Sequence, residues 1–336
     1  MFIRLERLFM SMECQALRCR PPYFMRRLAF ITAASLAFAV IPNPATADTG
    51  SVQESGALER SIKDDVRFKW NIQGQTQGAG VPNSTGIGTF RPFSIKENSL
   101  WFLDSQLNAN FGDFDGSSIV NTDVAGTSLS TSTRLGYRWL NDDRSWMYGV
   151  NAGYDSRNMN TGDADNATVT DKRDVTFQQV AFGVEAVNEE WNLNAYALIP
   201  TGDTEKKLND TYEGGALDTY GLDVGFDFTD KLSSSIGYYY QEGDLDKADG
   251  SGIKGRLAYD LGNGLTVGAN LSYDDAFDTR LSGDFKYNFG RNNGGRGNQK
   301  PSVIETLSAS PINRDVRVHD GICMAGWPIS YPVPCS

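Results

Sequence analysis

The sequence predicts an all-β protein, a twelve-stranded antiparallel transmembrane β-barrel, and three observations lead to this prediction. Between residues 66 and 289, apolar and polar side chains alternate with period two in successive runs of about ten residues, close to the ~9–11 that a tilted strand needs to cross a bilayer. Long and short connections separate these runs in alternation, as in outer-membrane barrels. After residue 47 no segment holds 18 consecutive apolar residues, which excludes a helical membrane protein.

The N-terminal residues have the three parts of a secretory signal. Two arginines precede an apolar run over 28–41, and Ala-Thr-Ala follows as the end of the signal. We expect cleavage between Ala47 and Asp48. Because the residues before Met25 fit no part of a signal, translation is predicted to start at Met25. The predicted order is an upstream extension (1–24), the signal (25–47), a periplasmic lead-in (48–65), the barrel (66–289) and a linker-like tail (290–336).

The charge and the cysteines limit the classes of function. The 336 residues carry a formal net charge of −11, and residues 1–47 contribute +4 of it, which leaves −15 for the rest of the chain. An acidic body without a basic patch argues against nucleic acid as a partner. Removal of the signal leaves only Cys323 and Cys335, which are compatible with one small disulfide-closed loop near the C-terminus.

Twelve strands are predicted in chain order, each bounded by Gly, Asn, Asp or Thr. They span 66–76, 86–95, 99–111, 131–140, 145–155, 176–187, 191–199, 219–229, 232–242, 252–261, 264–273 and 279–289. The second is the weakest, because Pro92 lies inside it and cannot donate to a ladder hydrogen bond. An open sheet edge would leave backbone groups unpaired in hydrocarbon, so we expect the strands to close on one another.

The run 99–111 shows the two faces of a predicted strand. Its apolar positions, such as Trp101, alternate with polar ones, and we expect the apolar set to face lipid and the polar set to face a wet lumen. The polar positions of the barrel are rich in Gly, Ser and Asn, which suits a narrow interior. The predicted lumen-facing residues are Asp104, Gln106, Asn108, Arg134, Arg138, Glu185, Asp223, Arg256, Asp284 and Lys286. Their charges either line a conducting path or pair across a plugged lumen, and both interpretations stay open at this point.

The connections predict which way the barrel points. Those after the odd-numbered runs are long, such as 112–130, 156–175 and 200–218, and those after the even-numbered runs are short. A chain that enters from the periplasm leaves its short turns there and its long loops outside. Trp and Tyr gather at the headgroup level of both membrane faces. The predicted girdle residues are Trp139, Trp146 and Trp191 beside the short turns, and Tyr154 and Tyr240 beside the long loops.

Three stretches resemble the translocator barrels of the inverse autotransporters, the intimin and invasin group. They are "FRPFSIKENSLWFLDSQL" (90–107), "RLGYRWLNDDRSWMYGVNAGYD" (134–155) and "VAFGVEAVNEEWNLNAYALIP" (180–200). The resemblance implies an N-terminal barrel of twelve strands, followed by a linker that passes through the pore to a C-terminal adhesin of immunoglobulin-like domains.

The segment "IETLSASPINRDVRVHDG" (304–321) is similar to the linker of that family, with Pro311, Arg314, Asp315 and Val318 in the matching places. Only about 15 residues follow it, far fewer than the ~100 of an immunoglobulin-like domain, so we expect a barrel without a folded passenger. At ~3.3 Å per extended residue, 300–320 is long enough to cross a ~30 Å membrane core, and we expect it to thread the pore.

These observations support one main hypothesis of function: a Gram-negative outer-membrane barrel of translocator type, reached after signal-peptide export. A porin-like small-solute channel is the alternative, and adhesion or binding through surface loops is a weaker one. An enzyme is not predicted, because general-base work most often falls to His and the single His319 lies outside the barrel. No cofactor and no metal site are predicted, because the acidic loops lack the calcium-loop pattern.

The predicted partners follow from the class of protein. Outer-membrane lipid is expected around the barrel, and the class implies periplasmic chaperones and the outer-membrane barrel-insertion machinery during assembly. Any surface receptor is unknown from the sequence.

Overall fold

The computed structural model describes residues 61–112, 122–124, 127–164, 168–245, 248–289 and 302–322. The predicted start at Met25, the predicted cleavage between Ala47 and Asp48, and the cysteines Cys323 and Cys335 lie outside the described residues. Within the described ranges, no helix is long and apolar enough to cross a membrane.

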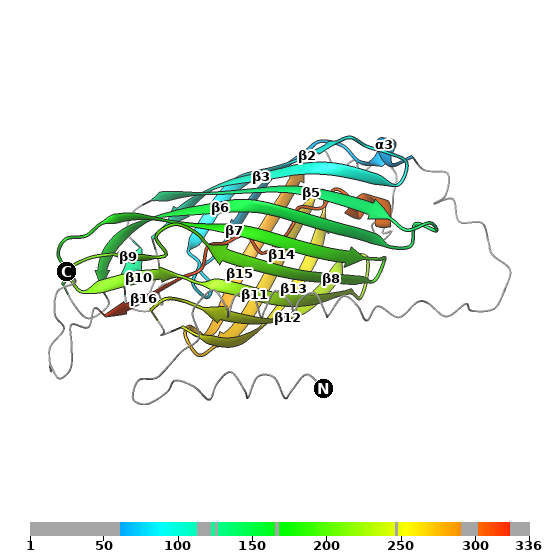
Figure 1. The fold of residues 1–336 in the computed structure, drawn as a ribbon. Helices are drawn as coiled ribbons and strands as arrows, with labels where there is room; N and C mark the ends of the chain where they lie inside the picture. The colour runs from blue at the N-terminus through cyan, green and yellow to red at the C-terminus, as the bar shows by residue number, and fades with distance from the viewer. Residues whose placement is uncertain are drawn as a thin grey trace, which may run out of the picture. The chain divides into compact units, whose positions relative to one another are not determined.

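Twelve antiparallel strands close into a barrel, which confirms the predicted fold class (Figure 1). The strands are β1 (Lys69–Gln75), β2 (Asn83–Phe93), β3 (Ser99–Phe111), β5 (Ser128–Leu140), β6 (Met147–Ala164), β7 (Asp174–Val187), β8 (Trp191–Pro200), β11 (Asp218–Asp227), β12 (Leu232–Glu242), β13 (Gly250–Gly262), β14 (Leu265–Asp274) and β15 (Asp278–Phe289). Each strand pairs with the next along the chain, and β15 returns to pair with β1 in a register that joins Trp70 to Phe289.

The weakest predicted strand is present as β2, and its proline is accommodated. The ladder between β1 and β2 ends where Lys69 faces Phe90. Pro92 lies beyond that point and has a ladder partner only on β3, where it faces Phe102. Pro92 therefore has a neighbouring strand on one side only, as a residue in an edge strand does.

The connections between strands sort to the two ends of the barrel. The turn end carries residues 94–98, 141–146, 188–190, 228–231 and 263–264. Of the described residues, the loop end carries 76–82, 112, 122–124, 127, 168–173, 201–217, 243–245, 248–249 and 275–277. The last of these is a tight turn, so the expected alternation of long and short connections is not strict there.

The loop end also carries additional strands that the sequence did not predict. β4 (Thr122–Val124) pairs with the far part of β6, which continues well past residue 155. β9 (Glu205–Lys207) and β10 (Tyr212–Ala216) belong to the connection between β8 and β11. β16 (Val318–Ile322) comes from the C-terminal tail and pairs with β10, so that loop and tail form one three-stranded sheet.

One side of the turn end is filled by an apolar cluster around two short helices. α3 (Ile62–Asp65) precedes the barrel, with Ser61 as its N-cap, and α4 (Val303–Thr306) follows the barrel. We call this group the turn-end cluster; its buried residues are Ile62, Val66, Phe90, Leu100, Phe102, Leu140, Met147, Val187, Val303, Ile304 and Leu307. The segments before and after the barrel are therefore packed together.

The outward and inward faces of the barrel differ in chemistry. Large apolar side chains are exposed on strand after strand, and Ile236 and Leu281 are 66% and 74% exposed. Many inward side chains are polar or charged, and Asp104, Arg134 and Arg138 are almost completely buried. This distribution is the reverse of a soluble protein, which rarely exposes a continuous apolar surface.

Candidate functional site

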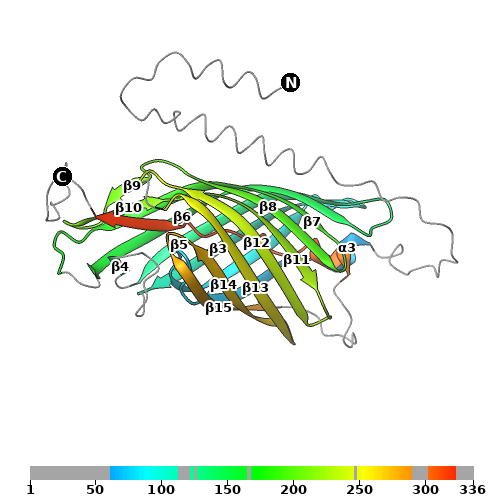
Figure 2. The same cartoon turned by 90° about the horizontal axis from the view of Figure 1, so that it is seen from below.

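The lumen of the barrel holds the C-terminal tail, residues 302–322. Figures 1 and 2 show this segment running inside the ring of strands from the end with α3 to the end with β10, where it becomes β16. At the turn end Arg138 Nη1 donates to the carbonyls of Leu307 (2.7 Å) and Ala309 (2.6 Å). At the loop end the amide of Val318 donates to the carbonyl of Gly80 (3.2 Å). The segment expected to thread the barrel is therefore inside it.

The first anchor of the tail is Arg138 on β5. Its Nε and Nη2 donate to the two carboxylate oxygens of Glu185 on β7, at 2.6 and 3.1 Å. Its guanidinium carbon lies 4.5 Å from the ring centre of Phe102. The remaining nitrogen is the one that holds the tail, so every donor group of this buried arginine has a partner.

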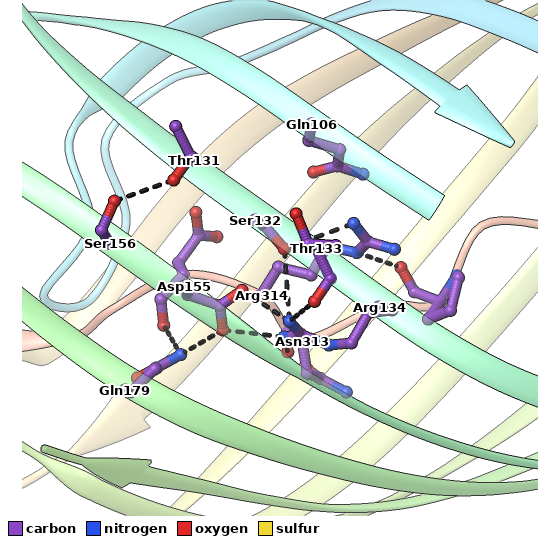
Figure 3. Close-up of polar contacts among 12 residues, drawn as sticks. Gln106, Thr131, Ser132, Thr133, Arg134, Asp155, Ser156, Gln179, Asn313 and Arg314 are labelled. Carbon is purple, nitrogen blue, oxygen red and sulfur yellow. Dashed lines mark hydrogen bonds and ion pairs between the residues drawn. The ribbon is translucent and has the colours of Figure 1, made fainter. Parts of the chain in front are cut away.

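The middle of the tail meets a network of wall residues, which Figure 3 shows in close-up. Arg134 on β5 and Asp155 on β6 form a bidentate ion pair with contacts of 2.6 and 2.8 Å. Gln179 on β7 donates to the same carboxylate at 2.8 Å. Arg314 of the tail lies 2.7 Å from Asp104 on β3 and donates to Ser132 Oγ at 3.3 Å. Wall charges and tail charges are thus parts of one network.

Asn313 crosses to the opposite wall. Its side-chain oxygen accepts from Lys254 Nζ (2.8 Å) on β13, and its amide donates to Asp223 (2.9 Å) on β11 and Asn194 (3.3 Å) on β8. The φ of Asn313 is 58°, in the left-handed region that Asn tolerates better than most residues. This local kink turns the amide toward β8, β11 and β13.

The loop-end part of the tail is held by arginines of both wall and tail. Arg157 on β6 donates to the carbonyls of Gly80 (2.6 Å) and Val316 (3.1 Å). Arg317 lies 3.1 Å from Asp274 at the end of β14, and its guanidinium carbon is 4.6 Å from the ring centre of Tyr239. The tail is therefore fixed at both ends and in the middle.

The predicted lumen residues lie in this network or beside it. Asp104, Arg134, Arg138 and Glu185 make the contacts described above. The other charged ones are Asp223, which pairs with Lys254 (3.0 Å), Arg256, which pairs with Asp284 (2.6 Å), and Lys286, which lines a cavity. Gln106 and Asn108 accept hydrogen bonds from Gln73 at 3.0 and 3.2 Å. Most of these charges are therefore paired, either along the wall or with the tail.

The four predicted linker residues lie within the threaded segment. The carbonyl of Pro311 accepts from Arg314 Nε at 3.0 Å, so the chain bends back on itself there. The carbonyl of Asp315 accepts from Gln179 and its carboxylate accepts from Gln75. Val318 is fully buried and begins β16.

Several residues of the network were missed by the sequence analysis. The predicted strand 145–155 ends at Asp155 and leaves Arg157 outside it. In the structure β6 continues, and both side chains lie on the same inward face as Asn151. Lys254 lies two residues before the predicted Arg256 and would follow from the same alternation. Asn313 belongs to an extended tail, for which no periodic signal exists.

A cavity of about 620 Å³ remains beside the tail. The tail contributes residues 310–315 and 317 to its lining, and the wall contributes residues of β1–β3, β8 and β11–β15, including Gln73, Lys254, Arg256, Asp284 and Lys286. The lumen is thus filled on the side of β5, β6 and β7 and hollow on the side of β1 and β11–β15.

Glycines on the inward face make room for the large side chains. A Cβ added to Gly153 would lie 1.8 Å from the carbonyl oxygen of Thr133 and 2.9 Å from Arg134 Cδ. At Gly225, beside the cavity, the nearest atom to an added Cβ is 3.3 Å away, on Asn192. The backbone contact at Gly153 therefore leaves no room for a Cβ, whereas Gly225 has nearly enough space for one.

The aromatic residues predicted as a girdle are found mainly at the turn end. Trp139 and Trp146 both contact Tyr148, with ring centres 5.9 and 6.3 Å apart, and Trp191 contacts Phe226 at 4.8 Å. Tyr240 lies near the loop end of β12. Tyr154 does not adjoin a connection, because β6 continues to Ala164.

The only histidine, His319, lies in β16 and packs edge-on against Phe277, with ring centres 5.7 Å apart. Within the described ranges, no group of three or more His, Cys, Asp or Glu side chains could hold a metal ion. The residues at this site therefore support binding and positioning of the tail.

Two connections at the loop end are joined by carboxylate contacts. The hydroxyl and the amide of Thr170 both donate to the carboxylate of Asp210, and these hydrogen bonds lower the pKa of Asp210 below its ordinary value of 3.8. Arg173 donates to Asp171, and this contact, helped by the charge of Lys207, lowers the pKa of Asp171 as well. The contact of Thr170 with Asp210 and the ion pair of Lys207 with Asp171 (3.5 Å) tie residues 168–173 to the connection that contains β9 and β10.

No protein-family model matches the sequence, and no curated protein matches it. Among solved structures, a chain described under "Unveiling the Mechanism Behind the in-meso Crystallization of Membrane Proteins" is similar with a TM-score of 0.51 and 12% identity, over 75% of this chain and 100% of that one. At this identity the similarity concerns the fold alone.

Two further solved structures are similar at lower scores. An outer membrane channel from Pseudomonas putida F1 is 13% identical, with a TM-score of 0.42, over 66% of this chain and 94% of that one. The beta domain of the Bordetella autotransporter BrkA is 15% identical, with a TM-score of 0.33, over 66% of this chain and 96% of that one.

Proposed function

We propose that this protein is an outer-membrane β-barrel of the inverse-autotransporter type, which holds its own C-terminal segment extended through the lumen and presents the end of that segment at the loop end. The observation that carries the proposal is the passage of residues 302–322 from the turn end to the loop end. A channel for solutes has no need of a segment that is bound along its whole course.

The apolar exterior supports a position within a lipid bilayer. A barrel exposes no sheet edge, and its outward apolar band suits hydrocarbon. The signal predicted over 25–47, with cleavage between Ala47 and Asp48, would deliver the mature chain to the periplasm. Insertion would then require the barrel-insertion machinery and periplasmic chaperones that this class of protein uses.

The second candidate is a small-solute channel, and one observation favours it: the polar cavity beside the tail. The ion pairs of Arg138 with Glu185 and of Arg134 with Asp155 favour the first candidate, because they lie where the tail is bound. We assign the barrel no reaction, and any receptor at the loop end remains to be found by binding experiments.

The proposal is tested by the position of the C-terminus in intact cells. An epitope appended after Ser336 should be detected by antibody on intact cells, and single cysteines in the connections 165–173 and 201–217 should react with an impermeant thiol reagent. Cysteines in the turns 141–146 and 188–190 are the matched controls and should react only after the outer membrane is permeabilised.

Two results would contradict the proposal. An epitope that becomes accessible only after permeabilisation, together with reactive loop cysteines, would place the C-terminus in the periplasm and favour the channel. Reactive turn cysteines on intact cells would reverse the orientation of the barrel.

A further inference from the structure

We infer that the cavity beside the tail is a vestibule open at the turn end and closed at the loop end by Arg317, so that the full-length barrel contains a latent path for small inorganic ions past its own tail. The inference rests on the proposed function only in that the barrel spans a membrane.

The cavity extends along most of the barrel. Near the turn end it is lined by Asp227 and Ser233, which flank the turn 228–231. Near the loop end it is lined by Ala79 and Val81, in the connection that follows β1. The cavity is lined by tail residues 310–315 and 317, so it accompanies the middle of the threaded segment along β1 and β11–β15.

The turn end of this path is polar and accessible. The turn-end cluster contains no residue from β11–β15, and its barrel residues come from β2, β3, β5, β6 and β7. On the other half, Asn192 is exposed, and Asp227, Ser233 and Thr266 are half-exposed. Ions and water can therefore approach the cavity along a hydrophilic mouth.

The loop end of the path is blocked by Arg317. Its Nη2 lies 3.1 Å from Asp274, its Nε donates to the carbonyl of Ala79 at 3.1 Å, and its guanidinium carbon lies 4.6 and 5.4 Å from the ring centres of Tyr239 and Phe277. A cation between two aromatic rings and a buried carboxylate is held from several sides.

Arg317 lies beside an apolar group that we call the exit cluster. It consists of the buried Leu217, Ala248 and Phe277, with Ala79 and Ala276 packed against them. The ring of Phe277 and the carbonyl of Ala79 both contact the guanidinium of Arg317. Arg317 therefore closes the loop end together with the exit cluster, and its side chain is the polar member of this closure.

The charges that line the vestibule are balanced once Arg317 is set aside. The cations are Lys254, Arg256, Lys286 and Arg314, and the carboxylates are Asp223, Asp227, Asp284 and Asp315. Charged rings and patches in a pore set its preference for anions or cations. Once opened, the path should therefore conduct small anions and cations with little preference.

The test measures single-channel conductance of the full chain in planar lipid bilayers with potassium chloride. Arg317→Ala should raise the conductance several-fold over the unsubstituted protein. Arg173→Ala is the matched control, because it removes an exposed loop-end arginine that also has a carboxylate partner, Asp171. Adding Lys286→Glu to Arg317→Ala should shift the reversal potential in a salt gradient toward cation preference.

A second measurement keeps the closure testable if Arg317→Ala fails to fold. Ser272→Cys leaves Arg317 intact and places a thiol in the lining of the cavity. A small charged thiol reagent should label it from the turn end in permeabilised cells and not from outside on intact cells. Labelling from both sides would show that Arg317 does not close the path, and labelling from neither side would show that the turn end is not open.

Failure of the inference can be separated from failure of the proposed function. Resistance of the barrel to protease in the same bilayer preparation reports insertion. Inserted Arg317→Ala protein with unchanged conductance would overturn the vestibule while leaving the barrel in the membrane. Absence of insertion for the unsubstituted protein would contradict the membrane-spanning barrel itself.

Discussion

Arg314 of the tail and Asp104 of β3 form a 2.7 Å ion pair in the interior of the barrel, where their side chains are only 6% and 0% exposed. Removing two charges from water is costly, and their attraction offsets the cost only while both partners are present. The buried charge of the tail residue and that of the wall residue are therefore each stabilised only by the presence of the other.

Removing one partner of this pair should destabilise the protein strongly. Arg314→Ala leaves the carboxylate of Asp104 buried without its counter-charge, and we expect a loss of ~3–5 kcal/mol in the free energy of unfolding. Urea titration of the barrel in detergent micelles measures it. Combining Arg314→Ala with Asp104→Asn should recover part of the loss, whereas additive losses would show that the two side chains do not interact.

The outward and inward faces of β12 should respond differently to a new charge. Ile236 is 66% exposed on the outside, and Ser235 lines the cavity. An Arg near the middle of a lipid-facing surface costs ~2–4 kcal/mol in a barrel, so Ile236→Arg should be destabilising by about that amount. Ser235→Arg should cost clearly less in the same folding assay in lipid vesicles. Equal losses would mean that the exterior of the barrel does not face lipid.

The inward glycine beside the Arg134 network should be indispensable. Gly153→Ala brings a methyl group against the backbone carbonyl of Thr133, which cannot move without disturbing the ladder between β5 and β6. We expect a lowered midpoint of urea unfolding. Gly225→Ala, beside the cavity, is the control and should have a much smaller effect. A folded, equally stable Gly153→Ala protein would show that the strands there are more adaptable than their contacts indicate.

Acid should loosen the connection that contains β9 and β10. The pKa values of Asp171 and Asp210 are below 3.8 in the folded protein, so their contribution to stability is present above the unfolded value and is lost as the pH falls through the folded values. Limited digestion with pepsin should show faster cleavage within 201–217 as the pH is lowered in this range. Thr170→Val removes the side-chain donor to Asp210 and should move the onset to higher pH; an unchanged onset would show that this contact does not hold the connection.

The barrel could be predicted because its physical signals are repetitive. Alternation with period two, strand lengths that fit a bilayer and turn residues between the runs all agree, so strands such as β3 were predicted with their bounds. The same alternation identified Asp104 and Arg134 as candidates for the lumen. Their burial follows from the closure of the barrel, which brings every inward side chain to one narrow space.

The partners of these residues could not be predicted. That Arg138 holds the carbonyl of Leu307 depends on where a tail without periodicity lies inside the barrel. The short elements α3, α4 and β16 were missed for a related reason: each is too short to form alone, and tertiary contacts stabilise it. Tyr154 was assigned to a loop-end girdle because the end of β6 was predicted too early.

The division of the lumen's ion pairs into two kinds has a consequence for assembly. Arg134–Asp155 and Arg138–Glu185 join wall to wall, whereas Asp104 and Asp274 find their arginines only on the tail. Before the tail enters, the closed ring therefore presents two carboxylates that lack an arginine partner, and Arg314 and Arg317 supply it. These carboxylates act as an electrostatic guide for capture of the tail. Since salt screens charges over ~10 Å at 0.1 M and ~3 Å at 1 M, refolding at high ionic strength should delay the protection of residues 302–322 from protease more than it delays formation of the strands.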